Sequence, residues 1–167
     1  MPKPLVSIVM GSDSDLPTMV EASDILKKFQ IPHEVRILSA HGLPKGTAQY
    51  AEGADRRGIR VIIAAAGGAA HLAGVVSAHT TLPVIGVPIE TKSLKGVDSL
   101  FSTVQMPPGV PVGTMAIGKS GAKNAGIFAA QILAVQNSSL RRKLGAYKKE
   151  LAHGVKVKDQ KVGFRFP

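Results

Sequence analysis

The sequence predicts an α/β protein: a three-layer, flavodoxin-like single domain in which helices cover both faces of a five-stranded parallel sheet, with one extra helix at the C-terminus. Short β-branched runs alternate five times with segments of helical periodicity. The connections between them are short, which favours a parallel sheet with helices on both faces. The chain has 167 residues, 44% of them hydrophobic, which suits one domain with a full core.

The first strand is expected at residues 5–10, where β-branched residues form an apolar run. The helix after it begins near Asp15, with Ser14 or Asp15 as the N-cap and Pro17 in the first turn. Its apolar stripe has spacings of three and four and consists of Met19, Ala22, Leu26 and Phe29.

The next two strands follow the same pattern. The second is expected at residues 34–38 and leads into a helix at 43–57, which Gly58 ends. The third is expected at residues 60–66 and leads into a helix of small residues at 68–79. Small residues allow such a helix to pack closely on a sheet or on another subunit.

The last elements complete the sheet and extend beyond it. A fourth strand is expected at residues 83–87, a helix at 97–105 and a fifth strand at 113–117. A core helix follows at 121–135, and residues 138–152 read as one more helix that projects from the body. We therefore expect a domain over residues 1–152 and a basic tail over residues 153–167.

The net charge of +10 is concentrated at the C-terminus. Residues 1–140 carry 12 Lys/Arg and 9 Asp/Glu, a balance of +3, whereas residues 141–167 carry 9 and 2, a balance of +7. A basic tail can bind nucleic acid nonspecifically, but a solvated helix and extension explain it as well. With two tyrosines and no tryptophan, the chain has little to stack on bases. We expect no specific nucleic-acid partner.

Composition excludes several further classes. No apolar run approaches the roughly 20 residues that span a bilayer, so no membrane association is expected. The segment before the first strand, residues 1–5, does not read as a signal peptide, which indicates a cytoplasmic location. The chain has no cysteine, which excludes disulfides, thiolate zinc sites and cysteine nucleophiles.

Polar and glycine-rich segments follow three of the expected strands, at residues 10–15, 39–41 and 67–72. Because the carboxyl ends of parallel strands lie along one edge of the sheet, these segments are expected to meet over one small ligand. Their hydroxyls, carboxylate, imidazoles and glycine-lined backbone indicate an anionic, phosphorylated ligand.

In the first segment, Ser12 and Ser14 can donate to phosphate oxygens, and Asp15 suits ribose hydroxyls. A helix N-terminus adds free N–H groups. Ser14 or Asp15 can instead serve only as a helix cap. The segment lacks the Gly-Lys-Ser/Thr of a phosphate loop and the dinucleotide-binding fingerprint.

The second and third segments each carry a histidine. His41 can exchange a proton near neutral pH, and His71, one turn into its helix, can orient a ligand. Gly67 and its neighbours can line a flat ligand closely, or they can merely permit tight packing. No His-x-x-x-His or mixed carboxylate cluster predicts a metal site.

Taken in order over residues 5–150, these segments resemble the class I N5-carboxyaminoimidazole ribonucleotide mutases of purine biosynthesis. The segments that carry the resemblance are Val9-Met-Gly-Ser-Asp-Ser-Asp15, Pro32-His-Glu-Val35, Ser39-Ala-His41, Ala66-Gly-Gly-Ala-Ala-His-Leu72, Pro83-Val-Ile-Gly-Val-Pro88, Gly96-Val-Asp-Ser-Leu100, Val104-Gln-Met-Pro107 and Asn124-Ala125.

The resemblance implies an enzyme that moves a carboxyl group from the exocyclic nitrogen to carbon 4 of an imidazole ribonucleotide, without metal, ATP or organic cofactor. It implies a homo-octamer with sites at subunit junctions. His41 would be the general acid/base. Ser12 and Asp15 match substrate-binding positions, with Ser14 and Ser39 nearby. The positions that match the wall around the base and the trapped CO₂ are Ala66, Gly67, His71 and Leu72.

One departure affects the substrate. The family usually reads Ser-Ala-His-Arg-Thr-Pro, and here the segment is Ser39-Ala-His-Gly-Leu-Pro44. Gly42 thus stands where the family has its phosphate-clamping arginine, and Lys45 could reach back only as a point charge. Two readings besides the mutase stay open: a carboxylase that uses free CO₂ and the unmodified aminoimidazole ribonucleotide, and a non-catalytic ligand-binding paralogue.

Overall fold

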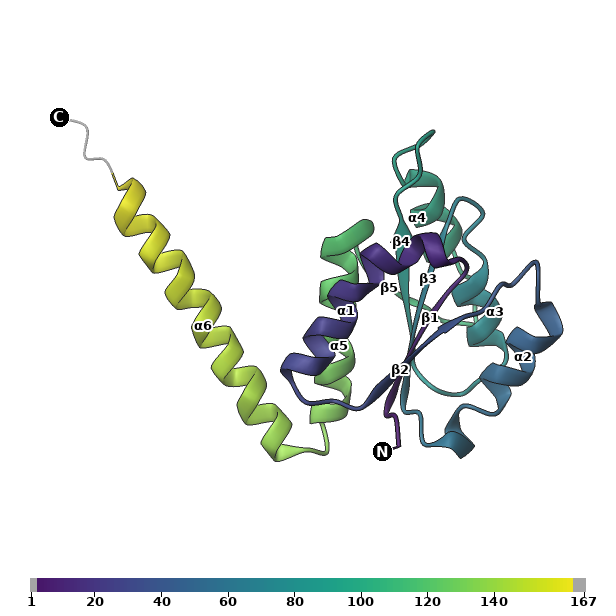
Figure 1. Ribbon diagram of the computed structural model, residues 1–167, viewed down its shortest axis with the longest axis horizontal. Helices are drawn as coiled ribbons and strands as arrows, with labels where there is room; N and C mark the ends of the chain where they lie inside the picture. Colours follow the sequence, from purple (N-terminus) through teal and green to yellow (C-terminus); the bar gives the residue numbers. More distant parts are fainter. Residues whose placement is uncertain (1–2, 164–167) are drawn as a thin grey trace.

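The computed structural model describes residues 3–163, which form a five-stranded sheet with helices on both faces (Figure 1). The strand order is β2-β1-β3-β4-β5, and every pairing is parallel. This order confirms the flavodoxin-like prediction. The strands are β1 (Val6–Met10), β2 (His33–Ile37), β3 (Val61–Gly67), β4 (Val84–Ile89) and β5 (Gly113–Thr114).

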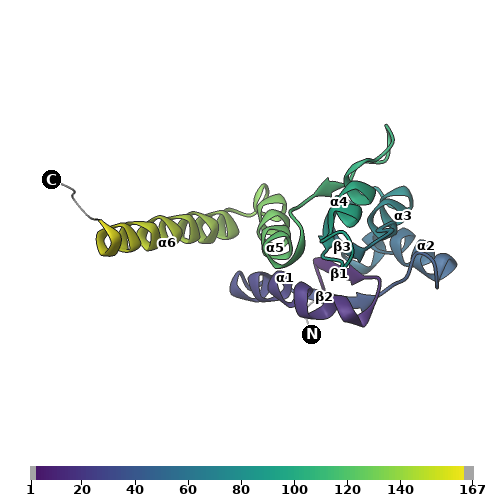
Figure 2. The same ribbon diagram turned by 90° about the horizontal axis from the view of Figure 1, so that it is seen from above.

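The helices form two outer layers (Figure 2). One layer consists of α1 (Leu16–Lys28) and α5 (Gly118–Ala134), which pack closely on each other. The other contains α2 (Pro44–Glu52), α3 (Leu72–Ala78) and α4 (Val97–Val104). Two short 3₁₀ helices, Asp13–Asp15 and Asp55–Arg57, join the main elements.

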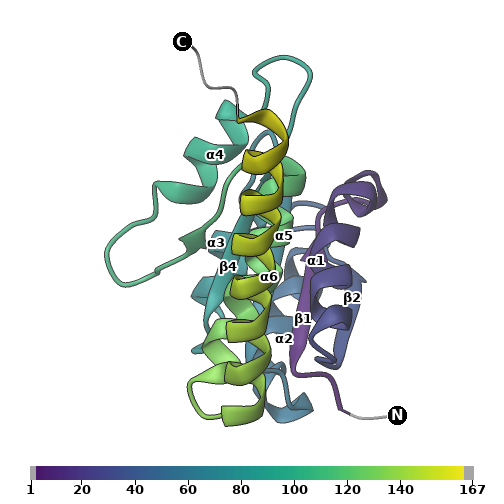
Figure 3. The same cartoon turned by 90° about the vertical axis from the view of Figure 1, so that its left-hand side faces the viewer.

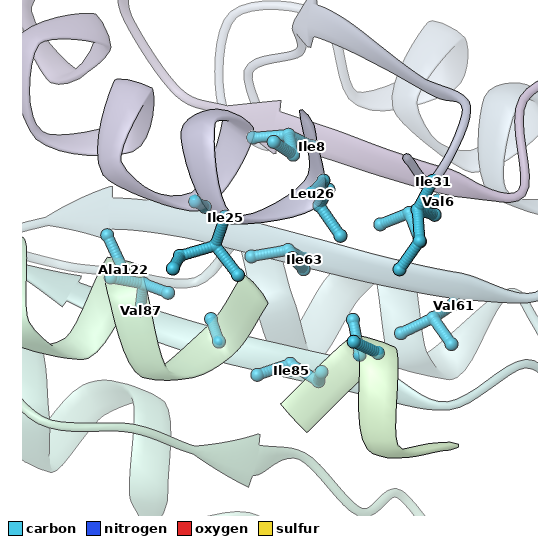
Figure 4. Close-up of a cluster of buried hydrophobic side chains, with 14 of the residues drawn as sticks. Val6, Ile8, Ile25, Leu26, Ile31, Val61, Ile63, Ile85, Val87 and Ala122 are labelled. Atoms are coloured by element: carbon cyan, nitrogen blue, oxygen red, sulfur yellow. The ribbon is translucent and has the colours of Figure 1, made fainter. Parts of the chain in front are cut away.

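Alternate residues of the central strands pack in two different hydrophobic cores, one on each face of the sheet. Val6, Ile8, Val61 and Ile63 point toward the α1/α5 layer (Figure 4), and Ile62 belongs to the opposite core. Both faces of β1 and β3 are buried, which explains why their sequences are continuous apolar runs instead of alternating ones.

One glycine shows how closely the second layer approaches the sheet. A Cβ at Gly86 on β4 would lie 2.5 Å from Cγ2 of Thr103 on α4 and 2.9 Å from Cγ1 of Val112. No side chain fits there without displacing α4. The absence of a Cβ at residue 86 therefore sets the distance between α4 and the sheet.

The start of one helix agrees with expectation, and the start of another does not. Helix α1 begins at Leu16 with Asp15 as its N-cap residue, as expected, although the Asp15 side chain makes no capping hydrogen bond; Ser12 caps the preceding 3₁₀ turn, with its Oγ accepting from the Ser14 N–H. The helix expected at 68–79 begins only at Leu72, because the turn before it is bound to α4 instead.

The helix expected at 43–57 is divided. Helix α2 ends at Glu52, and a separate 3₁₀ turn at Asp55–Arg57 leads to Gly58, whose φ of 99° ends the segment. Apart from the end of the last helix, the remaining strand and helix boundaries lie within a few residues of the expected ones, as is usual for element ends.

The C-terminal helix α6 (Ser138–Val162) projects from the outer side of the α1/α5 layer (Figures 1 and 3). Its first half is anchored: the Tyr147 ring meets the Phe29 ring edge-on at 5.6 Å, and Lys28 Nζ lies 2.9 Å from a Glu150 carboxylate oxygen. The helix was expected to end near residue 152 but continues to Val162, so the expected boundary between domain and tail falls inside it. Residues 164–167 of that tail lie outside the described residues. Across residues 3–163, no helix combines the length and apolar character that a membrane span requires.

Candidate functional site

A cavity of about 380 Å³ opens at the carboxyl ends of β1, β2, β3 and β4. It is formed by the segments that follow these strands, as the topology predicts. Nine of the ten predicted site residues line it: Ser12, Ser14, Asp15, Ser39, His41, Ala66, Gly67, His71 and Leu72.

Gly42 is the predicted site residue that does not line the cavity, but it lies against a residue that does. Its N–H donates to Ser39 Oγ at 2.9 Å. A Cβ on Gly42 would lie 3.2 Å from the same hydroxyl oxygen, and residue 42 does not have a positive φ. A side chain at position 42 would therefore start beside the Ser39 hydroxyl.

The turn after β1 forms a compact hydroxyl and carboxylate cluster. The Ser14 hydroxyl donates to Ser12 Oγ at 3.0 Å, and the Ser12 Oγ also accepts from the Ser14 N–H at 3.3 Å. Asp15 is buried beneath them. Burial raises the pKa of the Asp15 carboxyl; the Ser14 hydroxyl and nearby backbone amides only partly oppose this shift. The site thus holds a desolvated carboxyl group next to the hydroxyls of half-buried Ser12 and exposed Ser14.

The two site histidines contact each other. His41 Nε2 and His71 Nδ1 are 2.9 Å apart, and the rings meet edge-on with centroids 5.0 Å apart. Since a hydrogen bond needs one donor and one acceptor, only one of these two nitrogens carries a proton. The contact holds the exposed His41 ring at the cavity wall in a defined orientation.

Two serines of α4 hold the turn that carries His71. Ser99 Oγ accepts from the Gly68 N–H at 2.9 Å and donates to the Ile89 carbonyl at 2.7 Å. Ser102 Oγ accepts from the Ala70 N–H at 3.0 Å. The turn is therefore tied both to α4 and to the end of β4, which places the His71 ring beside His41.

Most of the chain is similar to one known protein family. The sequence profile of the AIR carboxylase family matches residues 5–154. The chain belongs to the AIR carboxylase family.

Two relatives of the chain carry the same name. N5-carboxyaminoimidazole ribonucleotide mutases from Synechocystis sp. and Bacillus subtilis are 54% and 58% identical to the chain. The first alignment covers 98% of this chain and 94% of the relative, and the second covers 85% and 88%. The crystal structure of Treponema denticola PurE has a TM-score of 0.85 at 28% identity, covering 96% of this chain and 99% of that one.

Sequence reasoning missed one charged residue in the cavity of this AIR carboxylase family member. Ile89 and Glu90 line it from the carboxyl end of β4. The rule that predicted the other segments also applies to β4, because a polar run at residues 90–93 follows that strand, and of this run Glu90 lines the cavity. Ser99 and Ser102 were missed because they act on the site from a helix about 30 residues away in sequence.

The segment 113–120 has the spacing of a phosphate loop, G-x-x-x-x-G-K-S, but does not form one. The Met115 N–H donates to the Gly86 carbonyl at 2.8 Å, which continues the sheet, and α5 begins at Gly118. The two residues left between them are too few for a loop that surrounds a phosphate. Over the described part of the chain, no group of three or more His, Cys, Asp or Glu residues is placed to hold a metal ion.

The raised pKa of Asp15 leads to a prediction about stability and binding. Between the ordinary value of 3.8 and the raised value, the folded state holds the proton more tightly, so Asp15 lowers stability as pH rises through this interval. Asp15→Asn is therefore expected to raise the free energy of unfolding at pH 7, and this gain should disappear below about pH 3.8. Binding of a ribose hydroxyl should weaken about tenfold through loss of the charged acceptor.

Urea unfolding at both pH values and calorimetry with the ribonucleotide measure the two effects. The matched control is Asp13→Asn, which changes an exposed neighbouring carboxylate. A stability gain that is equal for both variants, or that persists at low pH, would contradict the assignment to the buried Asp15.

Proposed function

We propose that this chain is an N5-carboxyaminoimidazole ribonucleotide mutase, an isomerase of purine biosynthesis. The observation that carries the proposal is the meeting of His41, held by His71, with the hydroxyl cluster of Ser12 and Ser14 in one cavity. The chain shares 54% identity with the mutase from Synechocystis sp. over nearly its full length, and this supports the same activity here.

The reaction needs one proton carrier and a closed space for CO₂. Protonated His41 donates a proton to the exocyclic nitrogen as the N–C bond of the carbamate breaks and CO₂ departs. Carbon 4 of the ring then attacks the retained CO₂, and His41 takes the proton that carbon 4 loses. Atoms and charge balance over the cycle, no electrons are gained or lost, and His41 returns to its starting state.

The cavity wall suits this sequence of steps. Ala66, Gly67 and Ala69 have small or no side chains, which leaves room for a flat imidazole ring and a CO₂ molecule beside Leu72. The hydroxyls of Ser12, Ser14 and Ser39 supply donors for phosphate, and Asp15 supplies an acceptor for ribose. The proposed reaction uses no metal or organic cofactor.

A direct assay tests the proposal. The purified protein is mixed with N5-carboxyaminoimidazole ribonucleotide, and formation of the 4-carboxy product is followed by ultraviolet absorbance against an enzyme-free blank. A second arm supplies aminoimidazole ribonucleotide with CO₂. Turnover in the first arm is expected. Turnover in the second arm alone would identify a carboxylase, and turnover in neither would favour a non-catalytic paralogue.

We further propose that the enzyme is a cytoplasmic homo-octamer. Apolar side chains on one face of α4 are exposed at Val97, Phe101 and Val104, and the distal half of α6 exposes Leu151 and Val155. Two such faces on one subunit give each copy more than one surface for contact with others.

Light scattering at micromolar concentration is expected to give a mass about eight times the 17.4 kDa of one chain. The paired substitution Phe101→Glu and Val104→Glu should lower this mass, while Lys158→Glu on α6 serves as a surface-charge control. A monomeric parent would contradict both the octamer and any site shared between subunits.

A further inference from the structure

The cavity has the wrong charge for a phosphorylated ligand. Of the described residues that line it, Asp15 and Glu90 are carboxylates and none is Lys or Arg. A phosphate monoester carries a charge of about −1.5 to −2 at neutral pH. Serine hydroxyls can bond its oxygens but do not offset that charge. A cation from just outside the lining is therefore needed for tight binding.

The hydroxyls show where the phosphate fits best. Ser12 and Ser14 follow β1, and Ser39 follows β2, its neighbour in the sheet. Glu90 follows β4, which is separated from β1 by β3. The hydroxyls therefore favour the β1/β2 end for the phosphate, away from the exposed Glu90 carboxylate, and the Asp15 carboxyl at this end is buried.

One lysine follows this end of the cavity lining closely in sequence. The Leu43 N–H donates to the Ser39 carbonyl at 2.9 Å, so the chain folds back from the cavity lining directly into the first turn of α2. Lys45 lies in that turn and is exposed. Across residues 3–163, no hydrogen bond or ion pair involves its ammonium group.

Gly42, three residues before Lys45, places no side chain of its own beside the Ser39 hydroxyl. The direction that a side chain at residue 42 would take leads to Ser39 Oγ, 3.2 Å from an ideal Cβ. With glycine there, residue 42 does not obstruct the flexible Lys45 stem on its way to a phosphate bound at Ser39.

We propose that Lys45 is a specificity-determining residue that supplies the cation for the substrate's phosphate group. This inference rests on the proposed function, because it takes the phosphorylated ribonucleotide as the ligand. Lys45 acts on binding and not on proton transfer, because proton transfer to and from the imidazole ring of the substrate takes place at His41. It therefore changes KM and leaves kcat unaltered.

The test compares two exposed lysines that follow the cavity lining in sequence, Lys45 after the β2 segment and Lys92 after the β4 segment. Lys45→Met is expected to raise KM for the carboxylated ribonucleotide about tenfold, equivalent to about 1.4 kcal/mol, with little change in kcat. Lys92→Met, two residues beyond Glu90, serves as the matched control and should leave KM nearly unchanged. Lys45→Arg should retain most of the affinity, because it keeps the charge.

Calorimetry separates the phosphate from the rest of the ligand. Lys45→Met should weaken binding of aminoimidazole ribonucleotide and leave binding of the corresponding nucleoside unchanged. Raising the salt concentration should weaken ribonucleotide binding to the parent more than to Lys45→Met. Lys45→Gln, which is also uncharged but polar, should match the methionine variant if charge is the cause.

Equal KM values for the parent and Lys45→Met would overturn the role of Lys45, and turnover by the parent would still support the mutase. Equal increases in KM for Lys45→Met and Lys92→Met would also overturn it, because they would indicate only a general electrostatic effect of surface charge. If the parent does not turn over the substrate but binds the ribonucleotide through Lys45, the proposed reaction fails and the phosphate contact stands. Absence of ribonucleotide binding by the parent would overturn both.

Discussion

His41→Asn is expected to lower kcat by about 10² to 10⁴-fold, the usual contribution of general acid/base catalysis, while the midpoint of thermal unfolding stays within a few degrees of the parent. Asparagine is close to histidine in size but cannot carry a proton between nitrogen and carbon 4. His41 is exposed, and its side-chain hydrogen bond among the described residues is the contact with His71. Its removal therefore leaves no core cavity, and surface changes of this kind usually alter stability by less than about 0.5 kcal/mol.

The matched control is His79→Asn. His79 is also an exposed histidine with one side-chain partner, Glu52 at 3.1 Å, but it lies at the far end of α3 and outside the cavity. Steady-state rates and thermal melts of both variants are compared with the parent. If His41→Asn keeps substantial turnover, or if His79→Asn loses as much, His41 is not the proton carrier.

The second expected result is tighter binding on introducing an arginine at residue 42. Gly42→Arg should strengthen binding of aminoimidazole ribonucleotide by about 2–3 kcal/mol, or 30-fold or more, because a guanidinium can form a charge-assisted and bidentate contact with phosphate. The backbone at residue 42 tolerates a side chain, and a Cβ there meets only the Ser39 side chain, whose hydroxyl can rotate. The energetic cost of the substitution is therefore small compared with the gain.

Calorimetry of the parent and Gly42→Arg with the ribonucleotide and its nucleoside measures this effect. The gain should be confined to the phosphorylated ligand, and Gly42→Met should separate added bulk from added charge. In the Gly42→Arg background, the effect of Lys45→Met should shrink, because both cations act on one phosphate. Equal affinities in all four combinations of protein and ligand would show that residue 42 does not face the phosphate, and a different substrate would then fit better.

Much of the fold could be predicted because it depends on local pattern and on general rules of parallel sheets. The continuous apolar runs of β1 and β3 indicate strands that are buried on both faces, and the structure confirms this. Parallel strands also bring their carboxyl ends to one edge, so Ser12, Ser39 and Gly67 could be placed around one cavity without a structure.

The length of α6 shows the weakness of periodicity as a guide. The apolar repeat fades after Leu151, which suggested an end near residue 152, yet the helix continues to Val162. Residues 153–162 include three lysines and a glutamine, which favour helix without contributing to a buried stripe. Helical propensity therefore extends α6 beyond the last residues of its apolar repeat.

By itself, the sequence determined the strand order, the edge at which a ligand binds and the residues that follow each strand, because these depend on the spacing of apolar residues along the chain. Only the tertiary structure decided how the site residues meet. The contact between His41 and His71 joins residues 30 positions apart, and the late start of α3 depends on hydroxyls of α4, with Ser99 bound to the Gly68 N–H from 31 positions away. Such hydrogen bonds form between elements that packing brings together, so no local sequence pattern predicts them.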